Sequence, residues 1–262
     1  AAAAKKAGRA ASEGLVGVAV DGANGAIVEI NCETDFVARN DTFQGFVGSV
    51  ANIALEAGSD LNALNSAAMP DSDRNVGEEL THLISTIGEN MTMRRAATIS
   101  VTKGALASYV HSAISPGLGK IGVLVGLESD ADADKLSEVG KQIAMHIAAA
   151  KPLSVSQDDL DPEELEREKS ILAEQARDSG KPENIIEKMV EGRLRKYYEE
   201  VCLLDQVFVI DGETKISDVL AKAGNDLGAP VSVSGFALFV LGEGVEKKEE
   251  DFAAEVAAAA AG

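Results

Sequence analysis

Apolar residues recur along the chain with two different spacings, which predict strands and helices in a repeated order. Leu15–Val20 (LVGVAV) and Ala26–Asn31 (AIVEIN) are short apolar runs on either side of the glycine-containing turn Asp21–Gly25. Two such runs around a tight turn predict a β-hairpin. From residue 41 to residue 57 the apolar positions instead recur every three or four residues, which predicts a helix with one buried face.

The same order recurs further along the chain. Ala105–His111 and Ile121–Leu127 are strand-like, and Ala133–Ala150 has helical periodicity, about 94 residues after the first unit. The pattern predicts an α+β fold with two related subdomains, each a small antiparallel sheet covered by a helix on one face. Leu124 and Val125 are expected in the core. Further strands are predicted at Ala96–Val101, Gln206–Ile210 and Ser234–Leu241.

The stretch from Asp158 to Glu200 is dense in charge and poor in apolar residues. Asp161-Pro162 is typical of a helix start, and Ser179–Pro182 ends that helix and starts another, with Pro182 suited to the first helical turn. Two helices of similar length with a short connection predict an antiparallel helical hairpin. This hairpin is either a solvated arm or a coiled-coil surface for a partner or a second copy of the chain, forming a homodimer.

These patterns suggest a division of the chain. We predict an N-terminal core subdomain in residues 1–103 and a C-terminal core subdomain built from residues 104–157 and 202–247. The helical hairpin in residues 158–201 is inserted into the second subdomain. Residues 248–262 are Ala-rich and predict a C-terminal helical module.

Composition then argues against several functional classes. Among 262 residues, 43 are acidic and 24 are basic, which gives a formal net charge of −19. Such a field repels phosphate backbones and anionic lipid, so we expect no direct nucleic-acid partner and no membrane partner. Cys32 and Cys202 lack metal-ligand spacing and suit a reducing compartment. We expect neither a metal nor a cofactor.

Catalytic chemistry has little support in the sequence. The three histidines, His82, His111 and His146, are far apart and have no adjacent nucleophile, and His146 is expected to pack in the core. Gly117–Lys120 lacks the first glycine and the final Ser/Thr of a phosphate-binding loop. Cys32 is better explained as a packed thiol than as a nucleophile. An enzyme is therefore not expected, and a small-molecule hydrolase is the weakest hypothesis.

One polar segment, Asn31–Asp41 (NCETDFVARND), is unusual because it places Phe36 between a predicted strand and a predicted helix. In one interpretation, Phe36 or Val37 folds back on the start of the helix as a hydrophobic staple. In the other, Phe36 is an exposed wedge with the adjacent carboxylate of Asp35, presented to a groove of a partner. The residues alone leave both interpretations open.

Several motifs together resemble one family. Glu33–Asp41 (ETDFVARND) resembles the signature of the elongation factor Ts family, the nucleotide-exchange factors for elongation factor Tu. Ile87–Asn90 (IGEN), followed by Met93–Arg95 (MRR), resembles a second family motif. Further matches follow in family order at Lys5–Arg9, Ile143–Ala149, Lys151–Pro152, Ser179–Pro182, Lys188–Arg193 and Asp251–Val256. The resemblance covers essentially the whole chain, and the small three-helix module with which family members usually begin is expected to be missing.

The resemblance implies a translation factor that binds elongation factor Tu·GDP and promotes GDP release, so that GTP can bind. Phe36, with Asp35 beside it, would enter the GTPase domain and disturb its Mg²⁺ and phosphate site. The implied partner-binding residues are Thr34, Asp35, Phe36, Val37, Ile87, Gly88, His111, Ala253 and Val256. The resemblance also implies a bacterial cytoplasmic location, with the mitochondrial or plastid matrix as the alternative.

A second hypothesis belongs to a different class of protein. A chaperone-like partner of the translation machinery could bind elongation factor Tu without driving exchange. The presence of Asp35-Phe36 and Ile87-Gly88 favours the exchange factor.

Overall fold

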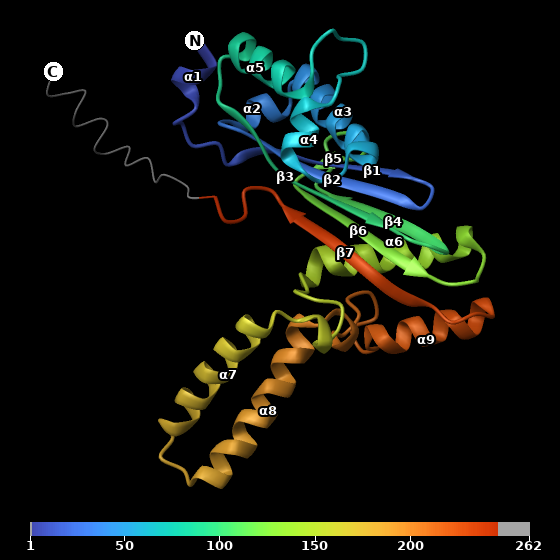
Figure 1. The fold of residues 1–262 in the computed structure, drawn as a ribbon. Helices are drawn as coiled ribbons and strands as arrows, with labels where there is room; N and C mark the ends of the chain where they lie inside the picture. The colour runs from blue at the N-terminus through green and yellow to red at the C-terminus, as the bar shows by residue number, and fades with distance from the viewer. Residues whose placement is uncertain (1, 246–262) are drawn as a thin grey trace, which may run out of the picture.

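The computed structural model describes residues 2–245 and shows an α+β fold built on two antiparallel sheets (Figure 1). The first sheet has the strand order β3-β2-β1-β5, and the second has the order β4-β6-β7. The strands are β1 (Glu13–Asp21), β2 (Asn24–Cys32), β3 (Met91–Ser100), β4 (Gly104–His111), β5 (Leu118–Gly119), β6 (Ile121–Glu128) and β7 (Ser232–Val240). The predicted fold class is confirmed.

Helices cover the outer face of each sheet, and short helices link the remaining elements. The α-helices are α1 (Ala2–Lys6), α2 (Asp35–Ala38), α3 (Asp41–Ala57), α4 (Leu61–Ser66), α5 (Val76–Ile87), α6 (Ala133–Ala150), α7 (Pro162–Arg177), α8 (Glu183–Val201) and α9 (Ile216–Leu227). Two short 3₁₀ helices are η1 (Gln157–Asp159) and η2 (Leu203–Asp205).

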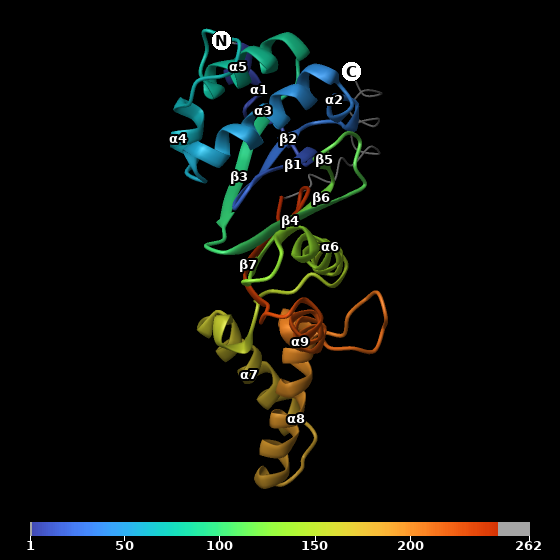
Figure 2. The same cartoon turned by 90° about the vertical axis from the view of Figure 1, so that its right-hand side faces the viewer.

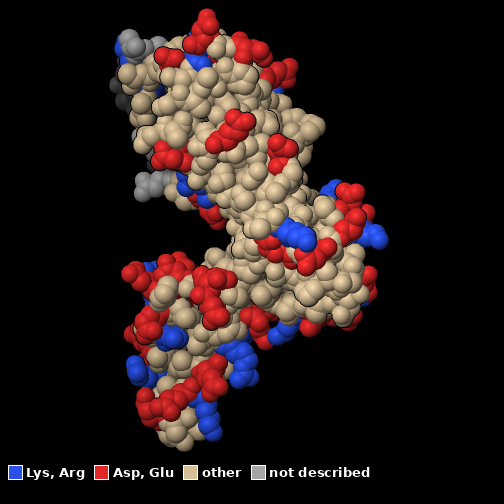
Figure 3. All heavy atoms as spheres, turned by 45° about the vertical axis from the view of Figure 1, so that its right-hand side comes forward, with Lys and Arg blue, Asp and Glu red and all other residues tan. Residues whose placement is uncertain are grey.

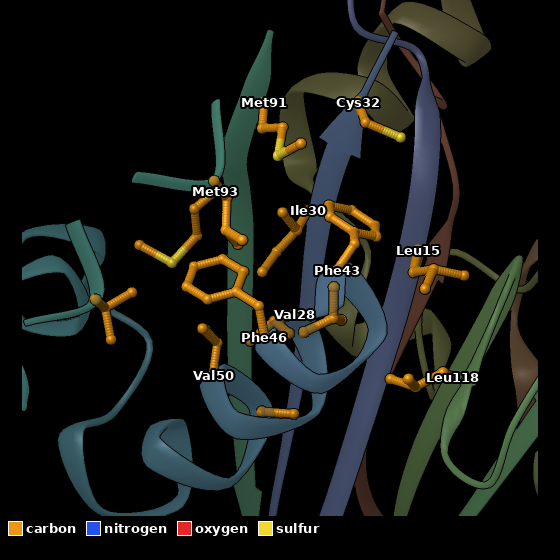
Figure 4. Close-up of a cluster of buried hydrophobic side chains, with 14 of the residues drawn as sticks. Leu15, Val28, Ile30, Cys32, Phe43, Phe46, Val50, Met91, Met93 and Leu118 are labelled. Carbon is orange, nitrogen blue, oxygen red and sulfur yellow. The ribbon is translucent and has the colours of Figure 1, made fainter. Parts of the chain in front are cut away.

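The first hairpin and helix form where the apolar pattern places them. Strands β1 and β2 pair antiparallel along their length, and α3 begins where the Asn40 side chain accepts hydrogen bonds from the N–H groups of Thr42 and Phe43. The buried face of α3 then inserts Phe43 and Phe46 against the outer face of the first sheet, as Figure 4 shows. These aromatic side chains make the first core largely a contact between one helix and one sheet.

The second unit repeats this arrangement with α6 on the second sheet. The Asp132 side chain caps α6 by accepting from the Lys135 N–H. Leu136, Ile143 and Ile147 of α6 are fully buried and belong to one core cluster with Val125 of β6. Leu124 and Val125 are both fully buried, as predicted, but their side chains serve different cores.

The inner faces of the two sheets pack against each other. The contact is apolar and is made by Val16, Ile27, Val101, Leu106, Leu124 and Phe239. Glycine permits this close approach at Gly122, where an added Cβ would lie 2.6 Å from a methyl group of Val16. The molecule therefore consists of four layers, helix, sheet, sheet and helix, rather than two sheets that are each covered on one face only (Figure 2).

A buried carboxylate joins the first sheet to the chain that follows β7. Glu29 of β2 is fully buried and accepts from Arg95 Nε at 2.5 Å, Arg94 Nη1 at 3.2 Å and the Gly242 N–H at 2.8 Å. Neighbouring residues of a regular strand point to opposite faces, but a register shift at Glu29/Ile30 lets Arg94 and Arg95 reach the same carboxylate.

The same arginines also hold the end of β7. Arg95 donates to the Val240 carbonyl at 3.0 Å and stacks over the Phe239 ring at 4.3 Å, and Arg94 donates to the Glu243 carbonyl. Burial raises the pKa of Glu29, but hydrogen bonds from Gly242, Asn31 and Arg95 outweigh this effect and hold the pKa below its usual value. Glu29 is therefore an ionised group at the meeting point of both sheets.

The division into subdomains stays a prediction. The predicted boundary between residues 103 and 104 falls between β3 and β4, yet β5 lies after that boundary and pairs with β1 of the first sheet. The predicted C-terminal helical module, residues 248–262, lies outside the described residues.

The buried residue His146 links the second core to the chain at the base of the hairpin formed by α7 and α8. His146 is fully buried, its Nε2 lies 2.8 Å from Gln206 Oε1, and its Nδ1 accepts from the Val209 N–H. Gln206 in turn donates to the carbonyls of Glu200 and Ala150. Because Nδ1 is an acceptor, the imidazole is neutral here. The prediction that His146 packs in the core is confirmed.

The predicted strand Gln206–Ile210 is wrong. Phe208 turns into the core and Val209 points outward, as the alternation requires, but the chain curls back so that the Gly212 N–H donates to the Phe208 carbonyl. Within the described residues, this segment makes one isolated antiparallel β-bridge, between Val207 and Lys215. Alternation specifies which side chains are buried, but it does not supply a neighbouring strand.

Helices α7 and α8 form the predicted antiparallel hairpin, which extends away from the sheets in both ribbon views (Figures 1 and 2). The Asp161 side chain caps α7, as predicted. Pro182 lies at the N-cap of α8 rather than in its first turn. Ala176 and Ile186 are buried between the helices, while charged side chains crowd the face of the arm seen in Figure 3.

Neutralising the buried carboxylate should destabilise the protein. Glu29→Gln leaves Arg94 and Arg95 facing an amide, and we expect a loss of about 3 kcal/mol in the free energy of unfolding measured in urea. Glu138→Gln, on the exposed face of α6, is the matched control and should change stability by less than about 0.5 kcal/mol. Equal stability of the two variants would contradict this account of Glu29.

Acid should weaken the His146 contact. Burial lowers the pKa of His146 from its usual 6.5, although the Gln206 hydrogen bond opposes this shift. Below pH 6.5 the unfolded chain therefore takes up a proton that the folded chain resists, so stability is complete above that pH and falls as the pH drops below it.

The stability that wild type gains over His146→Gln should thus shrink from pH 7.5 to pH 5.5, at no more than about 1.4 kcal/mol per pH unit. The exposed His82 supplies the control, because His82→Gln removes no buried contact and should change stability by less than about 0.5 kcal/mol. A difference between wild type and His146→Gln that is constant with pH would refute the coupling.

Candidate functional site

Phe36 is the most exposed of the large apolar side chains in the described part of the chain. Its relative exposure is 80%, whereas Val37 and Ala38 beside it are buried in the first core. The hydrophobic-staple interpretation is therefore wrong for Phe36, and Val37 is the residue that folds inward. The segment is also not an open loop, because Asp35–Ala38 forms the single-turn helix α2.

The inward side of α2 explains why Phe36 points outward. Val37 and Ala38 pack in the same cluster as Phe43 of α3. The side chain of Phe36 lies on the opposite side of the turn and therefore faces solvent. Asp35 forms an ion pair with Arg39 at 3.4 Å, but both side chains are largely exposed, so this pair adds little stability.

Two carboxylates brace the chain just before Phe36. Glu89 accepts from the N–H groups of Glu33 and Thr34 at 3.1 and 3.0 Å, and from the Thr34 hydroxyl at 2.6 Å. In return, Glu33 accepts from the Asn90 N–H at 2.6 Å and lies 3.5 Å from Arg9 Nη1. The two segments thus hold each other through side chains.

Ile87 and Gly88 lie next to this brace in the chain. Helix α5 begins at a capping box of Asn75 and Glu78 and ends at Ile87, after which Gly88 takes a left-handed conformation with φ of 95°. That turn directs Glu89 toward the chain before Phe36, and a residue with a Cβ would be strained in this conformation. Five of the predicted contact residues therefore meet at one place: Thr34, Asp35, Phe36, Ile87 and Gly88.

Val37, a further predicted contact residue, lies in the same segment but is buried, whereas His111 lies elsewhere. His111 is exposed at the end of β4 in the second sheet, with its Nδ1 3.2 Å from the Tyr109 hydroxyl. Within the described residues, no hydrogen bond or ion pair joins His111 to the Phe36 segment. Ala253 and Val256 lie outside the residues that the structure describes.

Cys32, close to this segment, is a packed thiol as predicted. It is fully buried and donates to the Thr34 carbonyl at 3.2 Å. Burial, reinforced by the nearby carboxylates of Glu89 and Glu13, raises its pKa to about 12. A thiol with that pKa is not ionised at neutral pH and does not act as a nucleophile.

Glu33 and Glu89 stand within the two family motifs, but the sequence alone assigns neither residue a role. The sequence does show that Glu33 directly precedes Thr34 and that Glu89 directly follows Gly88, so each glutamate lies next to a predicted contact residue. Their pairing was hidden, because the two segments are more than 50 positions apart in the chain.

Residues 2–245 contain neither a candidate membrane span nor a cluster of metal ligands. None of the helices there combines the length and the apolar character that crossing a membrane requires. In the same residues, no group of three or more His, Cys, Asp or Glu side chains is placed to hold a metal ion.

An exposed aromatic side chain on a braced turn is a feature that is typical of surfaces that contact another macromolecule. Comparison with known proteins identifies the family to which this surface belongs. The family model described as elongation factor TS matches residues 33–243.

Similar proteins named elongation factor Ts come from Paramagnetospirillum magneticum (64% identity over 99% of this chain and 83% of the relative) and Rhodospirillum rubrum (64% over 98% and 84%). Another, from Rhodospirillum centenum, is 62% identical over 99% of this chain and 85% of the relative. The chain belongs to the elongation factor Ts family. Membership implies a nucleotide-exchange factor for elongation factor Tu.

Proposed function

We propose that this protein releases GDP from elongation factor Tu by inserting Phe36, with Asp35 beside it, into the GTPase domain. The insertion disturbs the Mg²⁺ and phosphate site of that domain, GDP leaves, and GTP can then bind. The observation that carries the proposal is the 80% exposure of Phe36 on a short helix whose approach is braced by Glu89 and Glu33.

The proposed mechanism makes and breaks no covalent bond. The factor stabilises the nucleotide-free partner over the nucleotide-bound partner, and nucleotide must weaken factor binding by the same free energy. Each tenfold increase in release rate requires about 1.4 kcal/mol of such differential stabilisation. One buried aromatic ring supplies roughly 2–3 kcal/mol, so a thousandfold acceleration needs additional contacts.

The geometry suggests how those contacts are divided. Ile87 and Gly88, which are each partly exposed, add surface next to the wedge. Thr34 and Val37, the other proposed contact residues of this segment, also hold the wedge from the inner side. In this proposal His111, which lies on the second sheet, contacts a different part of elongation factor Tu. Ala253 and Val256 complete the proposed contact set as the terminal element.

Three predictions accompany this proposal without a structural test. Dimerisation through α7 and α8, the absence of direct nucleic-acid and membrane partners, and a bacterial cytoplasmic location all stay predictions. The rival function, binding elongation factor Tu without driving exchange, is separated from the proposal by measuring nucleotide release and complex formation in parallel.

Removing the wedge should slow exchange. Phe36→Ala is expected to lower factor-stimulated release of fluorescent GDP from elongation factor Tu by at least about tenfold, because the buried ring contributes roughly 2–3 kcal/mol. The substitution truncates an exposed side chain, so the melting temperature should change little.

Val20→Ala is the matched control for Phe36→Ala. Val20 is also an exposed apolar residue, 41% accessible, but it lies at the opposite end of the β1–β2 hairpin. Exchange by this variant should equal that of wild type. Stimulated release that is unchanged in a folded Phe36→Ala variant would sink the wedge mechanism, and tight binding without stimulated release by wild type would favour the rival function.

A further inference from the structure

Glu89 and Glu33 form a reciprocal pair across two segments that are distant in sequence. The carboxylate of Glu89 binds the backbone at Glu33 and Thr34, while the carboxylate of Glu33 binds the backbone at Asn90. We propose that Glu89, with Glu33, is a positioning residue that fixes the direction in which Phe36 is presented to the partner. This inference rests on the proposed function of Phe36.

The short helix that carries Phe36 needs such support. Helix α2 has four residues, and one helical turn is not stable by itself in water. Its N-cap residue, Thr34, makes no side-chain capping bond to α2, and its hydroxyl donates to Glu89. Glu89 therefore takes over both the hydroxyl and the amide of the residue from which the helix starts.

The contacts of Glu89 are strong for a side chain at the surface. An ionised carboxylate that accepts from backbone amides and a hydroxyl forms charge-assisted hydrogen bonds, which are shorter and stronger than neutral ones. The 2.6 Å contact to Thr34 Oγ1 is of that kind. Three bonds to one carboxylate leave the chain at residues 33 and 34 little freedom to rotate.

Glu33 completes the pair from the other side. Its short contact to the Asn90 N–H holds the chain after Gly88, and Arg9 supplies a positive charge beside the Glu33 carboxylate. Asn90 adds a bond from its Nδ2 to the Arg9 carbonyl at 2.7 Å. The Phe36 segment and the Ile87-Gly88 turn are thereby joined into one unit, so both approach the partner in a fixed relation.

The pair controls direction rather than core packing. Val37, Ala38 and Phe43 anchor α2 in the core through apolar contacts that involve neither carboxylate. Loss of Glu89 should therefore leave the protein folded while the exposed side of α2 gains freedom. Ordering that segment again during binding costs free energy, which weakens the contact of Phe36 with its partner.

A second site in the same chain provides a chemically matched control. Glu128 at the end of β6 also accepts from two successive backbone amides, those of Thr102 at 2.7 Å and Lys103 at 2.9 Å. This brace lies at the turn between β3 and β4, away from Phe36. Glu128→Ala removes the same type of contact without touching the proposed wedge.

The experiment measures GDP release from elongation factor Tu over a range of factor concentrations, for the full chain and its variants. Glu89→Ala should raise the half-saturating concentration by at least about fivefold, because the lost bonds must be replaced by ordering during binding. Glu89→Gln should fall between wild type and Glu89→Ala, since its amide oxygen still accepts from the backbone. Glu128→Ala should stay within about twofold of wild type.

A double variant shows whether Glu89 acts through Phe36. If it does, adding Glu89→Ala to Phe36→Ala should change exchange by less than about twofold, because the ring to be positioned is already absent. Backbone amide exchange provides a readout without the partner, and the Thr34 N–H should exchange faster in Glu89→Ala but not in Glu128→Ala.

The outcomes separate this inference from the proposed function. Impaired exchange in Phe36→Ala with wild-type exchange in Glu89→Ala would overturn the positioning role alone, as would fully additive effects in the double variant. Unchanged exchange in Phe36→Ala would overturn the proposed function itself. Should Glu89→Ala fail to fold, exchange by Glu89→Gln and the amide exchange of Thr34 decide whether Glu89 positions Phe36. A Thr34 amide that is unprotected in wild type would count against the brace.

Discussion

The face-to-face packing of the two sheets is the contact on which the rest of the structure depends. Val16 and Ile27 of the first sheet meet Leu124 of the second, and Gly122 keeps the interface thin enough for these side chains to interlock. Each sheet thus buries both faces, one against helices and one against the other sheet. Sites on the two halves of the molecule, such as Phe36 and His111, are therefore held at a fixed separation rather than joined by a flexible linker.

Polar groups reinforce this apolar contact at a place where the backbone of a strand is irregular. The register shift in β3 brings Arg94 and Arg95 to one side, and Glu29 unites them with the chain after β7. Glu89 and Glu33 repeat the principle at the surface, since carboxylates again satisfy backbone amides that no strand or helix partner reaches. The fold thus uses glutamate carboxylates to join segments that the sheets leave apart.

The periodic parts of the sequence predicted the structure well. The bounds of α3 and α6 match the predicted helices, because Phe43 and Phe46, or Leu136 and Ile143, mark a buried face with helical spacing. The incorrect or missing predictions concern contacts between segments that are distant in the sequence. Gln206–Ile210 alternates like a strand, but no strand within residues 2–245 lies beside it. Glu89 looks like an ordinary surface residue until Glu33 is placed against it. The spacing of apolar residues along the chain indicates which side chains are buried, whereas the pairing of segments depends on the topology of the fold.

Exposed aromatic surface also bears on how molecules of this protein meet one another. A phenylalanine that is 80% accessible is a site at which two copies can stick through apolar contact. The formal net charge of −19 gives every copy the same sign, and mutual repulsion slows encounters between them. The acidic surplus therefore supplies colloidal stability, which lets an exposed apolar side chain remain uncovered at high protein concentration.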